Sequence, residues 1–308
     1  MELSRTIRHA DGVTIGYRIL RGRTPRPLLV MIHGLASNNT RWSEFVDHTV
    51  LSHHWDLLRI DLRGHGDSMA RGHITMTDWV DDLAAILCCE GYKKATIVGH
   101  SLGAQVGMHF YAKYPSSVAA MIMIDPVFPD NLSGRLFKAK KLRLFVWLSV
   151  RLLWFVNWLG FRHRKFPPRD LRELDERTRK ILDNNPDIQI GDLYTNPFID
   201  LEFMPIANYM QDLLEVIRPL PPLENIDVPV LVLLSSGASV SDPGKNRAII
   251  NQMPSVEMVT IAANHWLLTE KPREARETIE KWCLTLNEAT IQGAATDRLT
   301  PLGSRPTE

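Results

Sequence analysis

The sequence has little cysteine, almost no net charge and no apolar segment at its start. Its three cysteines include the adjacent pair Cys88 and Cys89, so they supply neither a disulfide framework nor zinc-ligand spacing, which favours a reducing compartment. The formal net charge of +1 gives no argument for nucleic acid as a partner. Residues 1–12 lack the apolar stretch of a signal peptide, and we therefore expect a cytoplasmic protein.

Strand-like and helix-like segments alternate along most of the chain. The 308 residues are 44% hydrophobic and 23% charged, which is ordinary globular composition and allows one large core or two smaller units. The alternation predicts an α/β fold with a doubly wound, mostly parallel sheet. Apolar runs that predict strands occur at 28–32, 56–60, 95–98, 118–124, 228–234 and 256–261, and helical spacing occurs at 77–89, 102–114, 243–253 and 272–286.

One long insertion interrupts this alternation. Residues 127–222 are helical in pattern and contain several prolines, which leaves 1–126 and 223–287 as the α/β core. Because the insertion leaves one strand and returns to the next, we expect it to lie over the carboxyl edge of the sheet, where open α/β folds bind ligands. It is interpreted as a helical cap. Residues 288–308 turn to Thr, Ala, Gly and Pro and predict a disordered tail.

A serine flanked by glycines follows one of the predicted strands. Residues 97–103 read I-V-G-H-S-L-G, which fits a Gly-rich turn, a serine that caps the next helix, or a tight strand-to-helix turn that presents Ser101. In the third interpretation, the small residues at 99 and 103 leave the approach to Ser101 open. A base, an acid and an oxyanion site elsewhere in the chain would favour this interpretation.

In this setting, residues 99–103 resemble the G-x-S-x-G nucleophile elbow of the α/β-hydrolase superfamily. The resemblance covers most of the chain outside the insertion and the tail. Residues 31–35, M-I-H-G-L, resemble the H-G loop of that superfamily, which implies that the backbone N–H groups of Leu35 and Leu102 hold an oxyanion. Residues 61–68, D-L-R-G-H-G-D-S, resemble its D-x-R-G-x-G-x-S turn, and we interpret that turn as structural.

The resemblance also implies a catalytic base. Asn264-His265-Trp266 follows the strand that ends at Ile261, where the superfamily keeps its catalytic histidine. The family often has glycine just before that histidine, so Asn264 is a mild departure. A histidine at this place with no catalytic role is the alternative, but together with Ser101 in its elbow, His265 is predicted to be the base.

Two aspartates compete for the role of the acid. Many relatives carry it three residues beyond a glycine, after the strand that here ends at Leu234, but Val240 occupies that place. Asp242 comes two residues later and precedes a proline, which is typical of a helix N-cap. Asp125 ends the strand after the nucleophile helix, where a subset of the superfamily places its acid. We favour Asp125 and keep Asp242 as the alternate.

These residues imply a serine hydrolase of carboxylic esters. His265 would take the proton of Ser101 as the hydroxyl attacks, and the carboxylate would orient the imidazole. No metal or organic cofactor is required, and a serine at 101 argues against a mechanism with a carboxylate nucleophile. A thioesterase, a lactonase or an aminopeptidase would use the same triad. From a different class, a non-catalytic binding protein with this fold is the alternative.

The insertion contains an unusually apolar segment at 142–161. It has three tryptophans and only two charged residues, Arg143 and Arg151. As a helix it would be about 30 Å long, but one membrane crossing would separate Ser101 from His265, and Arg151 would cost about 3 kcal/mol. Two interpretations remain: cap helices bury the segment over an acyl pocket, or it forms a peripheral membrane anchor. Both predict a lipophilic or lipid ester as the substrate.

Overall fold

The computed structural model describes residues 2–9, 11–161, 165–185, 188, 190–194, 197–237 and 243–286, so the predicted tail at 288–308 lies outside the described residues. Eight strands form one sheet in the order β1-β2-β4-β3-β5-β6-β7-β8. The β1–β2 and β2–β4 pairs are antiparallel and the other pairs are parallel, which confirms the predicted fold class. The strands are β1 Glu2–Arg8, β2 Thr14–Leu20, β3 Leu28–Ile32, β4 Asp56–Ile60, β5 Ala95–His100, β6 Val118–Ile124, β7 Val230–Ser235 and β8 Val256–Ile261.

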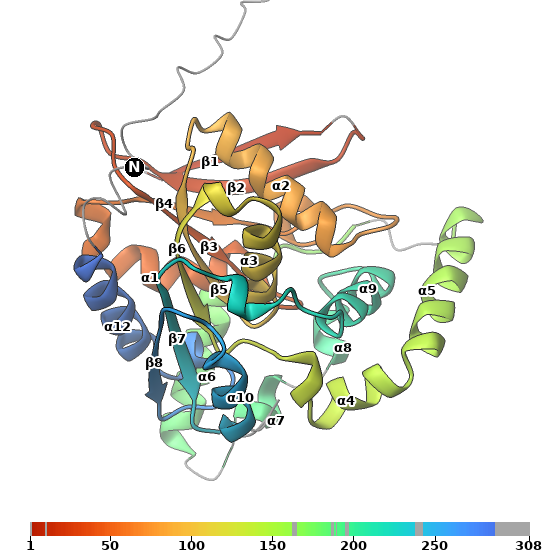
Figure 1. Ribbon diagram of the computed structural model, residues 1–308. Coiled ribbons are helices and arrows are strands. Elements are labelled where there is room, and N and C mark those ends of the chain that lie inside the picture. The colour runs from red at the N-terminus through yellow and green to blue at the C-terminus, as the bar shows by residue number, and fades with distance from the viewer. Residues whose placement is uncertain are drawn as a thin grey trace, which may run out of the picture.

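Helices cover both faces of the sheet (Figure 1). In β3, Leu28, Val30 and Ile32 belong to one apolar cluster, whereas Leu29 and Met31 belong to another, because successive side chains of a strand point to opposite faces. The first cluster includes side chains of α2, α3 and α10, and the second those of α1, α11 and α12. These helices are α1 Ser43–His48, α2 Met76–Cys89, α3 Leu102–Lys113, α10 Pro243–Ile250, α11 Leu267–Glu270 and α12 Pro272–Thr285.

Residues 127–222, which we call the insertion, connect β6 to β7 and contain six α-helices among their described residues. They are α4 Gly134–Lys141, α5 Arg143–Trp158, α6 Leu171–Asn184, α7 Ile190–Tyr194, α8 Pro197–Asp200 and α9 Ile206–Val216. Helix α5 lies at the margin of the molecule, next to α9 (Figure 1). In the described part of the chain, none of the helices has the length and apolar character needed to cross a membrane.

Candidate active site

Ser101 lies in a strained turn between β5 and α3. Its φ of 55° is in the left-handed region, which a non-glycine residue rarely adopts. A Cβ on Gly99 would lie 2.3 Å from the backbone of Gly103, and one on Gly103 would lie 2.3 Å from the carbonyl oxygen of Ile32. The two glycines therefore let β3, β5 and α3 approach closely. Ser101 itself is buried at this turn.

Three side chains from distant parts of the sequence meet at the carboxyl edge of the sheet. Ser101 follows β5, Asp125 follows β6, and His265 lies in the loop after β8. His265 Nε2 is 2.9 Å from Ser101 Oγ, and His265 Nδ1 is 2.6 Å from Asp125 Oδ2. The alternate acid, Asp242, lies outside the described residues. Within the described chain, Asp125 is thus the carboxylate that the fold brings to His265.

The surroundings of Asp125 keep its carboxylate ionised. Burial alone would raise the pKa of Asp125, but the hydrogen bond and charge of His265, with further hydrogen bonds from Ser235, hold that pKa below its usual value. The backbone N–H of Ser235 donates to Asp125 Oδ1 at 2.8 Å. An ionised carboxylate can only accept, so His265 carries its proton on Nδ1 and leaves Nε2 free to accept the Ser101 hydroxyl proton.

Sequence reasoning missed a contact of His100, the second residue of the G-x-S-x-G pattern. Its Nε2 donates to the backbone carbonyl of His265 at 2.8 Å. Burial, with the nearby His265 ring, lowers the pKa of His100 to about 3, so this imidazole is neutral at pH 7. His100 therefore ties the loop that carries His265 to the end of β5. No local sequence pattern indicates this contact, because it joins residues 165 positions apart.

The two predicted oxyanion donors flank Ser101. Leu102 is the first residue of α3, where backbone N–H groups have no partner within the helix. Leu35 follows Gly34, and a Cβ on Gly34 would lie 3.4 Å from the Ser101 Cβ, so this loop passes directly beside the serine. His33 holds the loop, because its Nε2 accepts the backbone N–H of Leu62 at 3.0 Å. Both predicted donors thus belong to backbone segments adjacent to Ser101.

The 61–68 turn makes contacts within the protein. Asp61 accepts the backbone N–H groups of Asn39 and Asp67 at 2.6 and 2.9 Å. The Ser68 hydroxyl donates to the carbonyl of Asp61 and accepts the N–H of Gly16, so it joins the turn to β2. These contacts fit the structural role predicted for the turn.

The insertion contacts the loops that surround Ser101 and His265. The Asn38 side chain, which follows the H-G loop, donates to the carbonyl of Arg169 at 2.8 Å. The Tyr194 ring of α7 lies 5.6 Å from the Trp266 ring, which in turn packs edge-on against His265. The insertion therefore contacts loops that follow β3 and β8.

A buried ionic cluster fixes α6 near the same loops. Arg41 forms an ion pair with Asp175 of α6 and donates to the Thr269 hydroxyl of α11. The Tyr194 hydroxyl donates to Asp175 at 2.6 Å. Charge and hydrogen bonding thus join the insertion to the core at several points around the site.

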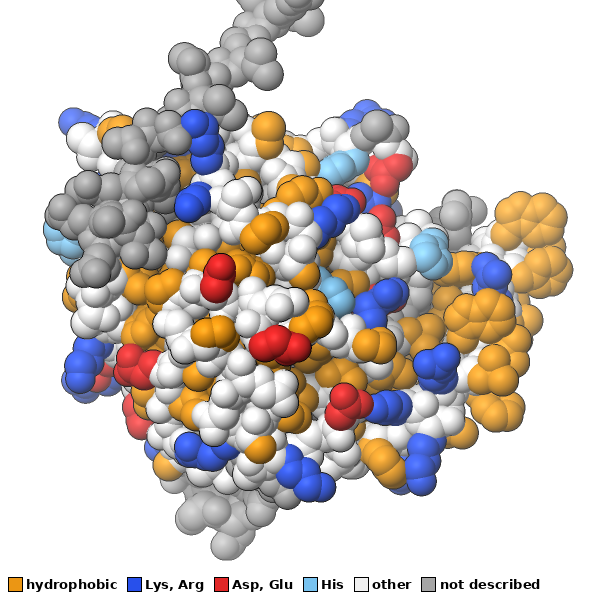
Figure 2. Space-filling model, in the orientation of Figure 1, with side chains coloured by type: hydrophobic (Ala, Val, Ile, Leu, Met, Phe, Trp, Pro, Cys, Tyr) orange, Lys and Arg blue, Asp and Glu red, His pale blue; other side chains and the backbone are white. Residues whose placement is uncertain are grey.

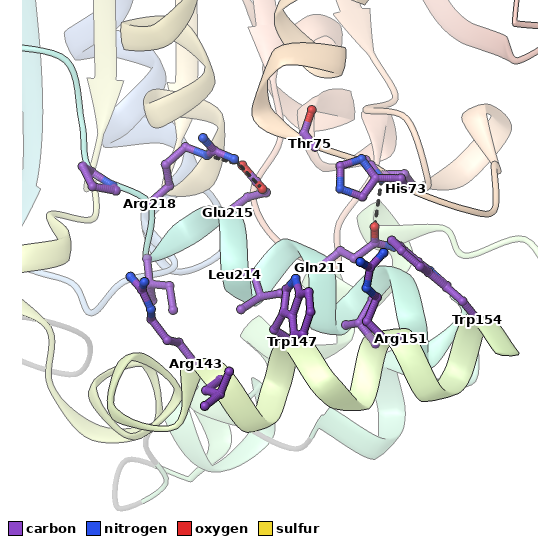
Figure 3. A pocket seen from close by; sticks show the side chains of 15 residues that line it. His73, Thr75, Arg143, Trp147, Arg151, Trp154, Gln211, Leu214, Glu215 and Arg218 are labelled. Atoms are coloured by element: carbon purple, nitrogen blue, oxygen red, sulfur yellow. Dashed lines mark hydrogen bonds and ion pairs between the residues drawn. The ribbon is translucent and has the colours of Figure 1, made fainter. Parts of the chain in front are cut away.

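A cavity of about 660 Å³ lies between α5 and α9, beside residues 73–75 (Figure 3). Trp147, Val150 and Trp154 of α5 line one wall, and Leu214 lies on the wall formed by α9. A second, more polar cavity of about 580 Å³ lies beside residues 36–40 and 61–69. Neither cavity has Ser101, Asp125 or His265 in its walls.

Comparison with known proteins identifies the family. The α/β hydrolase fold family matches residues 27–272, and the chain belongs to that family. Among curated relatives, the uncharacterized protein Rv2715 of Mycobacterium tuberculosis is 30% identical over 129 residues, or 39% of this chain and 37% of that protein. The chain thus matches little more than a third of the length of that relative.

Two other similarities extend over most of the chain. The mouse sn-1-specific diacylglycerol lipase ABHD11 is 22% identical over 272 residues, which cover 86% of this chain and 83% of the lipase. The thermophilic esterase of Thermogutta terrifontis has a TM-score of 0.63 at 22% identity and covers 92% of this chain and 98% of the esterase. The structural similarity supports the fold, and relatives of the esterase and lipase type support hydrolase chemistry.

Proposed function

We propose that the protein is a serine hydrolase of carboxylic esters, with Ser101 as nucleophile, His265 as base and Asp125 as acid. The observation that carries this proposal is the pair of hydrogen-bond distances that joins Ser101 to His265 and His265 to Asp125, 2.9 and 2.6 Å. A serine hydroxyl is a weak nucleophile at neutral pH, and an adjacent imidazole that accepts its proton makes it reactive.

The reaction proceeds in two halves. Ser101 Oγ attacks the ester carbonyl as its proton moves to His265 Nε2, and the Leu35 and Leu102 N–H groups stabilise the oxyanion. His265 then gives the proton to the leaving alkoxide, which departs as an alcohol and leaves an acyl-enzyme. Water, deprotonated by His265, attacks the acyl-enzyme and releases the carboxylic acid and free Ser101. Asp125 holds the imidazole and stabilises its protonated form.

We propose that the insertion acts as a cap and that lipophilic esters are the preferred substrates. The cap role is supported by the contacts from Arg169 and Tyr194 to the loops around the triad. The preference for lipophilic esters is supported by a relative, 22% identical to this chain, that is named a diacylglycerol lipase.

Labelling and mutation test the proposed triad. A fluorophosphonate probe should label Ser101 in the wild-type protein and leave Ser101→Ala unlabelled, as read by peptide mass spectrometry. Asp125→Asn should lower kcat by about 10⁴-fold, because the imidazole loses its correct tautomer. Asp242→Asn is the matched control and should leave kcat unchanged.

Three outcomes contradict parts of the proposal. A folded protein that the probe does not label would be a binding protein and not a serine hydrolase. A larger loss in Asp242→Asn than in Asp125→Asn would move the acid to 242. With para-nitrophenyl acetate, butyrate, octanoate and laurate, kcat/KM should rise with chain length, and a maximum at acetate would exclude the lipophilic preference.

A further inference from the structure

Helix α5 exposes one apolar face that no other described element covers. Val150 is its buried residue, at 3% exposure, whereas Phe145 is 67% and Leu152 is 62% exposed. Trp158, the last residue of α5, is 79% exposed. Other exposed apolar side chains of the same stretch are Leu142, Leu144, Trp147, Leu148, Phe155, Leu159 and Phe161. Contiguous apolar surface of this kind marks an interaction site.

The apolar face is concentrated on one side of the helix. Leu148, Leu152 and Phe155 are spaced by four and three residues, which places them on one stripe. Val150 and Trp154 lie on another stripe, which faces α9 and the cavity, and Trp147, although 45% exposed, also lines that cavity (Figure 3). The helix is thus held along its inner stripe, and the outer stripe forms the projecting edge of the molecule (Figure 2).

The sequence around this face is mostly basic, although Lys140 pairs with Asp130, which lies just before it. Residues 131–161 contain no Asp or Glu and six basic residues, which are Arg135, Lys138, Lys140, Lys141, Arg143 and Arg151. The whole chain has a net charge of only +1, so this positive charge is local. Lys138 and Lys141 are exposed at the end of α4, next to the start of α5. Basic residues beside exposed apolar and aromatic ones are typical of helices that bind anionic lipid surfaces.

We propose that the outer stripe of α5 inserts into the interface of an anionic bilayer, with the α4 lysines at the headgroups. The helix has 16 residues, or a length of about 24 Å, against about 30 Å for the hydrocarbon core, so it lies in the plane of the membrane. Leu148, Leu152 and Phe155 enter the acyl region, and Trp158 lies at headgroup level. Membrane binding goes beyond the proposed ester hydrolysis. It would bring the protein to lipid esters.

Vesicle binding tests this docking surface. The full chain should co-sediment with phosphatidylcholine–phosphatidylglycerol vesicles and much less with phosphatidylcholine alone. Leu152→Asp should lower the partition coefficient at least about tenfold, because a carboxylate replaces the isobutyl side chain that would enter the acyl region. The matched control is Leu284→Asp, since Leu284 is 60% exposed on α12, on the other side of the molecule in Figure 1, and it should bind as wild type.

Substitution of the α4 lysines tests membrane docking independently. Lys138→Gln with Lys141→Gln should lower binding to the anionic vesicles about tenfold or more and weaken its salt dependence. Lys271→Gln with Lys281→Gln, both on the α12 side, is the matched control. Ser101→Ala should bind vesicles as wild type, so a failure of membrane docking is distinguishable from a failure of the catalytic proposal.

Failure of wild-type protein to bind, an unaffected Leu152→Asp variant, or a dimer built on this face would overturn the proposal. The first two outcomes are wild-type protein that stays in the supernatant with anionic vesicles, and vesicle binding that is equal after Leu152→Asp. The third is a dimer in analytical ultracentrifugation, without lipid, that Leu152→Asp converts to a monomer. In that case a second copy of the chain covers the outer stripe of α5.

Discussion

Helix α9 buries polar side chains, whereas helix α5 exposes apolar ones, although both belong to the insertion. In α9, one face carries Asn208, Gln211, Asp212 and Glu215, and all four are buried. In α5, the exposed face carries leucine and phenylalanine. The two helices pack against each other, so the difference does not reflect distance from the core alone.

The partners of the α9 side chains explain their burial. The Asn208 amide donates to the carbonyls of Gly64 and Ala70, and the Gln211 amide accepts the N–H of Ile74 and donates to the carbonyl of Gly72. The polar face of α9 thus satisfies backbone groups of the loop between β4 and α2. Buried polar groups are tolerated where they are hydrogen-bonded, and they fix one arrangement of the two surfaces. Among the described residues, the exposed face of α5 has no partner of this kind.

Among the substitutions predicted for these two helices, Asp212→Ala should have the largest effect on stability. Asp212 Oδ2 lies 3.0 Å from His65 Nε2, and both side chains are buried. Removal of one member of a buried pair leaves the other without compensation, and we expect a loss of about 3 kcal/mol. Urea unfolding, followed by circular dichroism, measures the change. Asp183→Ala, at an exposed position of α6, should cost less than about 0.5 kcal/mol.

The pH dependence of this loss has a defined sign. Burial alone would lower the pKa of His65, but the Asp212 carboxylate outweighs burial and raises that pKa. A raised histidine pKa contributes stability fully below the unfolded value of about 6.5, and the contribution is lost as the pH rises through the folded value. The destabilisation by Asp212→Ala should therefore shrink as the pH rises. A loss that grows with pH would contradict this account of the pair.

Gln211→Ala should have an intermediate effect. It leaves the buried N–H of Ile74 and the carbonyl of Gly72 without their side-chain partner, which we expect to cost about 2 kcal/mol in urea unfolding. Gln211→Glu is the informative companion, because it keeps the acceptor for Ile74 and loses the donor to Gly72. Equal stability of the wild type and Gln211→Ala would mean that the polar face does not hold α9 in place.

The sequence predicted the sheet and the three residues that meet at its edge better than it predicted the insertion. The runs at 28–32 and 118–124 form strands with those bounds because strands buried on both faces require continuous apolar residues. Ser101 and Asp125 each directly follow such a strand, so their meeting follows from the topology. The contact of His100 with the His265 carbonyl spans 165 residues and leaves no local pattern.

The sequence predicts a helical cap over the carboxyl edge of the sheet but not the contacts that hold the insertion, for a physical reason. The partners of Asn208 and Gln211 are backbone groups of residues 64–74, which any sequence provides, so no composition or spacing indicates the contact. For 142–161, apolar character on nearly every face did not distinguish burial from exposure. The structure divides the segment, since the Val150 side faces α9 and the Leu152 side is exposed.

The smallest change in stability is expected for a substitution on the outer stripe of α5. This prediction sharpens the contrast with α9. Phe145 is exposed, so Phe145→Gln loses little burial and gains slightly in helix propensity, and the free energy of unfolding should change by less than about 0.5 kcal/mol. Val150→Ala, on the buried stripe of the same helix, should cost about 1 kcal/mol or more because it leaves a cavity. Both are measured by urea unfolding without lipid. A large loss in Phe145→Gln would show that the outer stripe is covered by protein in solution, and its exposure would then no longer favour a membrane.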